Sequence, residues 1–483
     1  MAAAALDQLR SIFPDDSTDK VVINESADKY QAAVTCPWSQ TCWTPAAAYV
    51  YLSTVQELTK ALAIVQETGT KFAVRTTGHN PNAGFSSAGE AAVVLDIRQL
   101  RSKELLSDQG TARFGSGNTW GEVYAWLEER GLSAIGGRDS QVGLGGFLLG
   151  GGMGALPNLY GLGADGVKNF EILLADGRLV NANRNENSDL YRALKGGGSN
   201  FGITTNFTIT TGIVTRFDLE THPLIKVQYT INLYNPEDYV AINQATFEVQ
   251  QTMEEDPRIG LFTNFNNGFV AVGLLYGDHP AESEARETFK PFHNLKSLMT
   301  TVLPSTNGTL LSLAQAMGHA QTSLKRAICT VTTRNSTALY DEVYKAWVEV
   351  RKTLPADTVL HYTIQPFGKA AVQAGKERGE NIMGHESVPQ CWWVFTCEWP
   401  KDGDDAAAQS AVDIMSEKVQ YLAKDKGLLL DFKCMSFATA SQRVLGSYGV
   451  DNIKRMQEVA AKYDPEGVFQ KLQNGGFLLR DNV

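Results

Sequence analysis

Gln141-Val-Gly-Leu-Gly-Gly-Phe-Leu-Leu-Gly-Gly-Gly-Met-Gly-Ala-Leu-Pro-Asn-Leu-Tyr-Gly-Leu-Gly-Ala164 is the stretch of sequence that says most about the fold. Its 24 residues carry no charge, and nine of them are glycine. Each glycine in an ordered segment costs roughly 0.5–1 kcal/mol of backbone entropy relative to alanine, so such a run is typical of a main chain that adopts positive φ or approaches a ligand closely. A transmembrane helix would fit the length, but Pro157, Asn158 and the crowded glycines leave too little apolar side chain for one. We therefore expect a backbone surface that holds a large, flat ligand.

The composition is that of an ordinary globular protein. The 483 residues are 43% hydrophobic and 20% charged, which is enough for a large core divided into two or three domains. With 43 basic and 53 acidic residues the net charge is −10, which argues against a nucleic-acid partner and favours a small-molecule substrate. We expect no membrane association and a monomer or homodimer.

The N-terminus, the cysteines and the histidines give weaker information. No basic segment followed by a long apolar one opens the chain, so we expect a cytoplasmic protein, with secretion as the alternative if the sequence is trimmed. The six cysteines show no C-x-x-C spacing and the seven histidines no H-x-x-x-H or H-x-H spacing, so no metal site is predicted. Cys391 and Cys397 lie in an apolar run typical of a strand, and their even spacing puts both thiols on one face.

Residues 47–75 predict a strand, a capped helix and a second strand. Ser53 or Thr54 is the expected N-cap, and apolar residues recur after it at helical spacing. Because the second strand ends at Arg75, the loop Thr76-Thr-Gly-His79 lies at the carboxyl end of a strand, where α/β architectures bind ligands.

A second glycine cluster, Lys195-Gly-Gly-Gly-Ser-Asn-Phe-Gly-Ile203, follows a hairpin expected to turn at Asp176-Gly177. Neither glycine cluster is a P-loop, because the G-x-x-x-x-G-K-[S/T] pattern is absent, and the run from Gly143 is a weak dinucleotide fingerprint because it follows a loop and is not a strand-turn-helix unit. What remains is a cradle of main-chain N–H groups, which binds pyrophosphate without a lysine. The loop from Arg75 to His79 fits that role.

Six motifs in this order identify a family. They are Arg75-Thr-Thr-Gly-His79, Val142-Gly-Leu-Gly-Gly-Phe-Leu-Leu-Gly-Gly-Gly-Met-Gly154, Tyr160-Gly-Leu-Gly-Ala-Asp165, Leu174-Ala-Asp-Gly177, Gly196-Gly-Gly-Ser-Asn-Phe-Gly-Ile203 and Tyr463-Asp-Pro-Glu-Gly-Val-Phe-Gln470 with Asn474-Gly-Gly-Phe477. Together they resemble the FAD-linked oxidases of the vanillyl-alcohol oxidase, or PCMH, superfamily, in its berberine-bridge-enzyme-like group. The spacing is most similar to that of fungal natural-product oxidases.

The resemblance implies an α+β fold. It consists of a PCMH-type FAD-binding domain of two α/β subdomains and an inserted substrate domain with an antiparallel sheet backed by helices. The FAD domain would comprise residues 1–215 and a returning C-terminal segment, residues 431–483, with residues 216–430 as the substrate domain. The inserted part agrees, because strands such as Phe269-Val-Ala-Val-Gly-Leu-Leu-Tyr276 alternate there with helical stretches such as Asp341–Lys352.

His79 resembles the histidine that the family bonds covalently to the 8α carbon of FAD. Relatives with a second, cysteinyl link carry Cys-x-x-Val-Gly where this sequence has Asp139-Ser-Gln-Val-Gly143, so a single link is expected. Such a link raises the flavin potential and prevents loss of the cofactor. The residues that the resemblance assigns to FAD are Arg75, Thr76, Thr77, Gly78, His79, Asn80, Ser86, Gly137, Val142, Gly143, Gly145, Gly146, Gly150, Gly152, Gly202, Ile203 and Asn474.

The implied activity is that of an oxidase, which removes a hydride from a small, secondary-metabolite-like substrate to flavin N5 and returns the electrons to O2 as H2O2. An alcohol or phenol substrate also needs a base. Many relatives carry Asn-Tyr near the C-terminus, whereas this sequence has Ser436-Phe437, and phenylalanine accepts no proton. The candidate bases are therefore Tyr362, His361 and Glu398. The aromatic candidates for the substrate pocket are Trp392, Phe395 and Phe437.

Two alternatives stay open at this point. One is an oxidative cyclase, desaturase or pericyclase-like enzyme on the same fold, in which the shape of the pocket does more than acid–base chemistry. The other, from a different class, is a flavin-binding protein without catalytic activity.

Overall fold

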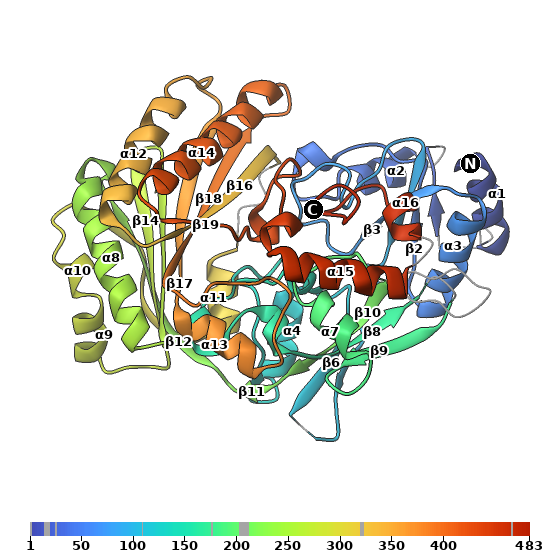
Figure 1. The fold of residues 1–483 in the computed structure, drawn as a ribbon, viewed down its shortest axis with the longest axis horizontal. Helices are drawn as coiled ribbons and strands as arrows, with labels where there is room; N and C mark the ends of the chain where they lie inside the picture. Colours follow the sequence, from blue (N-terminus) through green and yellow to red (C-terminus); the bar gives the residue numbers. More distant parts are fainter. Residues whose placement is uncertain are drawn as a thin grey trace.

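The computed structural model describes residues 2–13, 20–24, 27–108, 110–174, 177–201, 212–318, 323–464 and 467–483. Within these residues the strands form four sheets, and the chain is of mixed α and β type, as predicted. In Figure 1 the largest sheet and its helices occupy the left half, and the N-terminal elements occupy the right half. No helix among the described residues is both long and apolar enough to cross a membrane.

The N-terminal part is a four-stranded sheet with helices on both faces. Its order is β1 (Val21–Val22), β2 (Ala48–Tyr51), β4 (Ala92–Asp96) and β3 (Lys71–Arg75), and β2, β4 and β3 run parallel. The helices are α1 (Ala2–Ile12), α2 (Ala27–Val34) and α3 (Val55–Glu67). The predicted strand, helix and strand are thus confirmed, and Thr54 is the N-cap because its side chain accepts a hydrogen bond from Glu57 N.

A five-stranded antiparallel sheet follows. Its order is β5 (Lys103–Leu105), β6 (Thr111–Gly115), β10 (Ile213–Glu220), β8 (Val167–Leu173) and β9 (Leu179–Asn183), and β7 (Leu132–Ser133) pairs separately with β11 (His222–Pro223). The accompanying helices are α4 (Trp120–Glu128), α5 (Leu144–Leu149), α6 (Pro157–Tyr160), η2 (Gly163–Gly166) and α7 (Ser188–Leu194). β8 and β9 form the predicted hairpin, although Asp176 at its turn lies outside the described residues.

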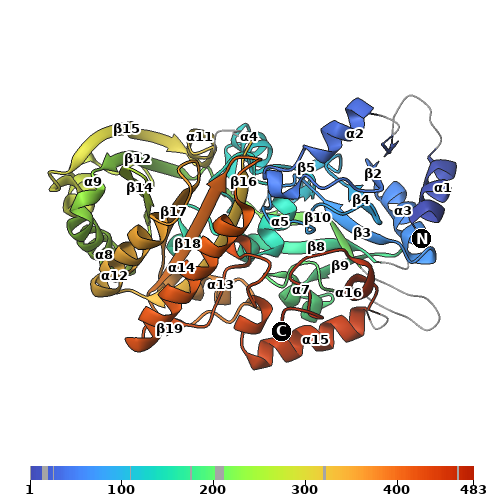
Figure 2. The same ribbon diagram turned by 90° about the horizontal axis from the view of Figure 1, so that it is seen from above.

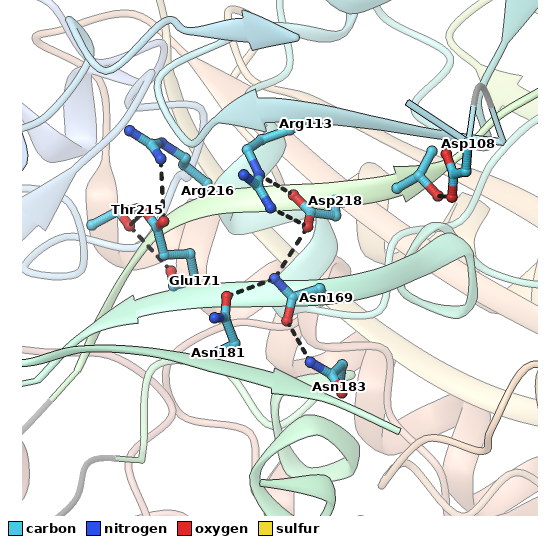
Figure 3. A network of polar contacts seen from close by, with 10 residues as sticks. Asp108, Arg113, Asn169, Glu171, Asn181, Asn183, Thr215, Arg216 and Asp218 are labelled. Carbon is cyan, nitrogen blue, oxygen red and sulfur yellow. Dashed lines mark hydrogen bonds and ion pairs between the residues drawn. The ribbon is translucent and has the colours of Figure 1, made fainter. Parts of the chain in front are cut away.

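A ladder of polar side chains crosses four strands of this sheet (Figure 3). Arg113 on β6 forms a two-point ion pair with Asp218 on β10, at 2.7 and 2.9 Å. Asp218 accepts from Asn169 on β8 at 3.2 Å, and Asn169 exchanges hydrogen bonds with Asn181 and Asn183 on β9. Cross-strand pairs of this kind each contribute roughly 0.2–1 kcal/mol, so the ladder helps to fix the strand register.

The inserted part is built on an eight-stranded antiparallel sheet. Its order is β15 (Leu298–Thr309), β12 (Lys226–Tyr234), β14 (Phe269–Gly277), β13 (Ile259–Asn266), β17 (Val359–Phe367), β18 (Gln390–Trp399), β16 (Lys325–Arg334) and β19 (Leu429–Leu430). Its larger helices are α8 (Tyr239–Glu255), α12 (Thr337–Arg351) and α14 (Asp405–Asp425). The shorter ones are η3 (Pro236–Asp238), α9 (Glu282–Thr288), α10 (Lys290–His293), α11 (Leu310–Ala316) and α13 (Lys369–Glu377).

Helices α8, α12 and α14 cover one face of this sheet (Figure 2) and form an apolar core with it. Side chains alternate along a strand, so every second residue of β17 and β18 enters that core and the others face away from it. Trp393, Phe395 and Cys397 are in the core, whereas Thr396 and Glu398 face a cavity on the other side. Cys391 and Cys397 share a face, as predicted.

The C-terminal segment returns to the first half of the chain. It comprises η4 (Met435–Phe437), η5 (Leu445–Ser447), α15 (Val450–Tyr463) and α16 (Val468–Leu472). One further short helix, η1 (Gln40–Cys42), belongs to the N-terminal part of the chain. Asn474 N donates to Phe72 O at 2.7 Å, beside β3, and α15 packs against α7. The boundaries at residues 215 and 430 stay a prediction, and β10, residues 213–220, runs across the first of them.

Candidate functional site

A cavity of about 720 Å³ lies between the glycine-rich loops of the first half and the open face of the eight-stranded sheet. The loops contribute residues 76–82 and much of 137–150, and the C-terminal segment contributes residues 435–437 and 475–477. The sheet contributes alternate residues of β13, β17 and β18. Three distant parts of the chain therefore form one site.

The glycines of the run 141–164 bring two loops into contact. A Cβ at Gly143 would lie 2.4 Å from Thr77 Oγ1, and one at Gly145 would lie 3.1 Å from Thr76 Cγ2. Gly146 differs, because a Cβ there would meet no atom within 4 Å and would point into open space at the cavity. The backbone surface predicted from the sequence therefore borders the cavity.

Two serine hydroxyls beside the cavity have no hydrogen-bond partner among the described residues. Ser86 Oγ and Ser116 Oγ are both inaccessible to solvent, and both residues line the cavity. Buried polar groups are nearly always hydrogen-bonded, so these two hydroxyls suit a ligand that brings its own polar groups. A dinucleotide with hydroxyls, phosphates and a flat ring fits both the hydroxyls and the glycine surface.

Most residues predicted to bind FAD line this cavity. They are Thr76, Thr77, Gly78, His79, Asn80, Ser86, Gly137, Val142, Gly143, Gly145, Gly146 and Gly150. Gly202 and Ile203 lie outside the described residues. Arg75, Gly152 and Asn474 are described but do not line the cavity.

The structure places Arg75, Gly152 and Asn474 outside the cavity, unlike the prediction that they contact FAD. The Arg75 side chain is 1% exposed, and its Nε donates to Asp96 Oδ2 at 2.9 Å, so a carboxylate of its own chain neutralises it. Gly152 has φ +75° and packs against Phe147, where a Cβ would lie 2.4 Å from the ring. The Asn474 side-chain amide donates to Gly84 O at 3.0 Å and so stabilises the loop that contains Gly84.

His79 belongs to a column of stacked groups that joins the two halves of the site. Its ring is 4.5 Å from that of Trp38 at an angle of 13°. The Arg326 guanidinium lies over the Trp38 ring at 4.1 Å. Arg326 Nε also donates to Glu398 Oε1 at 2.7 Å, and the Arg326 side chain is only 3% exposed. The column thus runs from the loop that carries His79 to the sheet that carries Glu398.

His361 lies beside Glu398 on the open face of the sheet. Asn264 Nδ2 donates to Thr363 Oγ1 at 2.9 Å, faces the Tyr362 carbonyl at 3.4 Å and lies 3.1 Å from His361 Nδ1. Since this amide nitrogen is a donor, Nδ1 accepts, and the neutral ring carries its hydrogen on Nε2. Nε2 lies 3.9 Å from Glu398 Oε2, so two of the three predicted bases meet at the cavity.

Tyr362 does not reach the cavity, contrary to its prediction as a base. The side chain is fully buried in the helix-covered core, where it stacks on Phe265 at 4.8 Å and meets Trp347 edge-on. Burial raises the pKa of Tyr362 well above its usual value, so the hydroxyl stays protonated. Neighbouring residues of a strand face opposite ways, and therefore His361 and Tyr362 cannot both line the site.

The predicted aromatic pocket is also corrected. Phe437 lines the cavity, but Phe395 lies in the helix-covered core. Trp392 faces the open side yet packs in an aromatic cluster beyond the cavity, stacked on Phe367 at 4.5 Å and beside His385. Its position near the start of β18 places it outside the cavity.

The residues of the site that the sequence analysis missed include Trp38, Arg138, Asn264 and Gln365. Gln365 could have been found, since it follows His361 and Thr363 at strand spacing on β17. The other three come from segments that show no motif, and the fold alone brings them together.

The comparisons with known proteins show an FAD binding domain and FAD-dependent relatives. Residues 46–183 match the FAD_binding_4 family, described as an FAD binding domain. The chain is 36% identical over 451 residues to an FAD-dependent monooxygenase of Arthrobotrys oligospora, which covers 93% of this chain and 85% of the relative. The chain belongs to the FAD-dependent oxidoreductases of the vanillyl-alcohol oxidase, or PCMH, family.

Two further similarities were found, one in sequence and one in fold. The bifunctional solanapyrone synthase of Alternaria solani is 30% identical over 491 residues, covering 98% of this chain and 88% of the synthase. The glucooligosaccharide oxidase of Acremonium strictum, described with a 6-S-cysteinyl, 8α-N1-histidyl FAD, has a TM-score of 0.77 at 18% identity, covering 96% of this chain and 97% of the oxidase. The second likeness is one of fold.

Gly146→Leu tests the flavoenzyme's FAD site. The Cβ of the added side chain would meet no protein atom within 4 Å and would lie at the cavity, so the fold should be kept while FAD is excluded. Steric overlap of this size costs about 1–3 kcal/mol, which is roughly a fivefold to 150-fold fall in FAD affinity. The measurement is the FAD content of the purified protein together with its circular dichroism.

The control is Gly89→Leu, where a Cβ also meets nothing within 4 Å but the residue does not line the cavity. Full FAD content in Gly146→Leu would contradict this position of the cofactor.

The buried His385 should lower the free energy of unfolding of the flavoenzyme in acid. Burial lowers the pKa of His385 to about 3, and its Nε2 has no hydrogen-bond partner among the described residues. Below the usual value near 6.5 the unfolded chain binds a proton that the folded chain does not, so stability falls as the pH drops toward 3. The difference in unfolding free energy between pH 7 and pH 5 should be smaller in His385→Phe, by on the order of 1 kcal/mol. Denaturant unfolding at both pH values measures it, with His279→Phe as the surface control. An equal loss in wild type and His385→Phe would contradict the prediction.

Proposed function

We propose that the protein is an FAD-dependent oxidase of a small secondary-metabolite substrate. The observation that carries this is the cavity in which the His79 loop and the glycine surface oppose a sheet face that presents His361 and Glu398. FAD held there would supply the acceptor, at flavin N5, for a hydride from a substrate carbon, with O2 taking up the electrons to give H2O2. The chain's own residues would bind the substrate, exclude water and remove a proton.

His79 is the residue proposed to carry FAD through an 8α-histidyl link. Its imidazole lines the cavity, and the stack on Trp38 fixes the plane of the ring. The fold relative from Acremonium strictum is described with a histidyl and a cysteinyl link. Asp139 occupies the position of the second link in the motif, and a carboxylate forms no such thioether. A single covalent bond follows.

Glu398 is the proposed proton acceptor. Its Oε1 is held by Arg326, and its Oε2 is directed toward the cavity beside His361. His361 keeps Nδ1 occupied by Asn264 and would donate from Nε2 to a substrate oxygen. A donor and an acceptor on adjacent strands could therefore hold a substrate hydroxyl while its proton leaves.

Oxidative ring closure is the second candidate. It is favoured by the 30% identity with the bifunctional solanapyrone synthase over 98% of the chain. Phe262, Phe269 and Phe437 give the cavity apolar walls that could fold a flexible substrate before or after oxidation. NMR of the product distinguishes the two, because both products have lost two hydrogens and have the same mass, but only the cyclised product has exchanged multiple bonds for a new ring.

Acid precipitation of purified wild type and His79→Ala tests the covalent link. The wild-type pellet should retain the yellow colour, whereas His79→Ala should release all flavin to the supernatant, because it lacks the attachment atom. Flavin released from both proteins would show that His79 only positions the cofactor. Peroxide release during turnover then checks the use of O2, and the absence of flavin from the native protein would favour a catalytically inactive protein.

Glu398→Gln tests the proton acceptor. The amide keeps its shape and can still accept from Arg326, but it takes no proton from the substrate. On the first alcohol or phenol found to reduce the FAD, kcat should fall about 10²–10⁴-fold with a smaller change in KM. Tyr362→Phe is the control, since it changes the helix-covered core only, and its kcat should match wild type. Unchanged kcat in Glu398→Gln would remove this residue from the mechanism.

A further inference from the structure

Arg138 places a positive charge at the cavity. It follows Gly136 and Gly137 in the loop before α5, and its side chain lines the cavity beside β17. Its Nη2 donates a short hydrogen bond to Gln365 Oε1. The proposed mechanism assigns nothing to either side chain.

No described carboxylate neutralises this charge. The carboxylates that line the cavity are Asp139 and Glu398. Glu398 is paired with Arg326, and Asp139 Oδ1 accepts from Gln141 N at 2.8 Å. Throughout the described part of the chain, no acidic oxygen lies within 4.0 Å of the Arg138 guanidinium. A charge removed from bulk water costs several kcal/mol unless it is paired, so an unpaired arginine at a binding cavity points to an anionic ligand.

The guanidinium remains charged in this position. Burial lowers the pKa of Arg138 to about 10, which still leaves the group protonated at neutral pH. Arginine presents several N–H groups in one plane, and this arrangement matches the two oxygens of a carboxylate or an enolised dicarbonyl.

Gln365 adds a second donor next to the first. Because its Oε1 accepts from Arg138, its NH2 group is oriented elsewhere, and it donates to none of the described residues. Arg138 N–H groups and the Gln365 NH2 therefore form neighbouring donors. Gln365 is four residues from His361 on the same face of β17, which places the two about 13 Å apart along the strand.

We propose that Arg138 and Gln365 form an oxyanion subsite and that the substrate of this flavoenzyme carries an anionic oxygen group, as a carboxylate or an acidic enol. This inference rests on the proposed function, since it takes the cavity to be the substrate site. Binding of the anion at one end of β17 would orient the remainder of the substrate toward His361 and Glu398 at the other. The subsite thus selects acidic molecules over neutral sugars and simple alcohols.

The test is a binding titration of the FAD-loaded protein with 2-naphthoate and with its neutral analogue 2-naphthamide. The flavin absorbance spectrum and isothermal calorimetry both report binding without turnover. Wild type should bind the carboxylate about tenfold to a hundredfold more tightly than the amide, as expected for hydrogen bonds to a charged group. Arg138→Gln should lose this preference while keeping its affinity for the amide, and Arg138→Lys should keep part of it.

Controls separate the possible outcomes. Arg334→Gln, at the exposed end of β16, should bind both probes as wild type does. A wild-type protein that binds both probes equally would overturn the subsite even if it proves to be a working oxidase. An Arg138→Gln protein that keeps the preference for the carboxylate would also overturn it. Loss of FAD from Arg138→Gln would overturn it too, because the arginine would then bind the cofactor and not the substrate. A parallel titration with 2-acetylcyclohexane-1,3-dione shows whether an acidic enol is accepted as well as a carboxylate.

Discussion

The stacked column of His79, Trp38 and Arg326 is the interaction on which the rest of the site depends. It is the point where the loop at the end of β3 meets the inserted sheet, with the guanidinium 4.1 Å from the indole and the imidazole 4.5 Å from it on a near-parallel plane. Arg326 serves both sides, since it also holds Glu398 at 2.7 Å and donates to the Trp38 carbonyl at 2.9 Å. The loop that carries His79 and the Glu398 carboxylate are thus fixed relative to one another through the one buried Arg326 side chain.

The glycine run supplies the complementary constraint. Gly143 and Gly145 allow close contact with the loop that precedes His79, and Gly146 leaves space that the cofactor can fill. Side chains at the first two positions would separate the loops, while one at the third would occupy the cavity. The glycines lose more backbone entropy on folding than other residues would, but only they allow the main chain itself to form the surface of the cavity. Arg138, in the loop before α5, extends this surface toward Gln365 on β17.

The sequence predicted the first half of the molecule well, because glycine, helix-cap and strand patterns are local. The elements from β2 to β3, the hairpin β8 to β9 and the cavity position of His79 all followed from them. The inserted half was predicted only as a sheet with helices. Which residues face the site depends on which side of the sheet the helices cover, and that is a tertiary property. Tyr362 and Phe395 were misplaced for this reason, whereas His361 and Glu398 lie on the open face.

A crystal structure of the FAD-loaded protein is the measurement that tests the account most directly. The account predicts continuous electron density from the His79 ring to the flavin, with the isoalloxazine between the backbone at Gly146 and the sheet face that carries His361 and Glu398. Flavin density that is separate from His79, or a flavin ring outside the cavity beside β17 and β18, would contradict it.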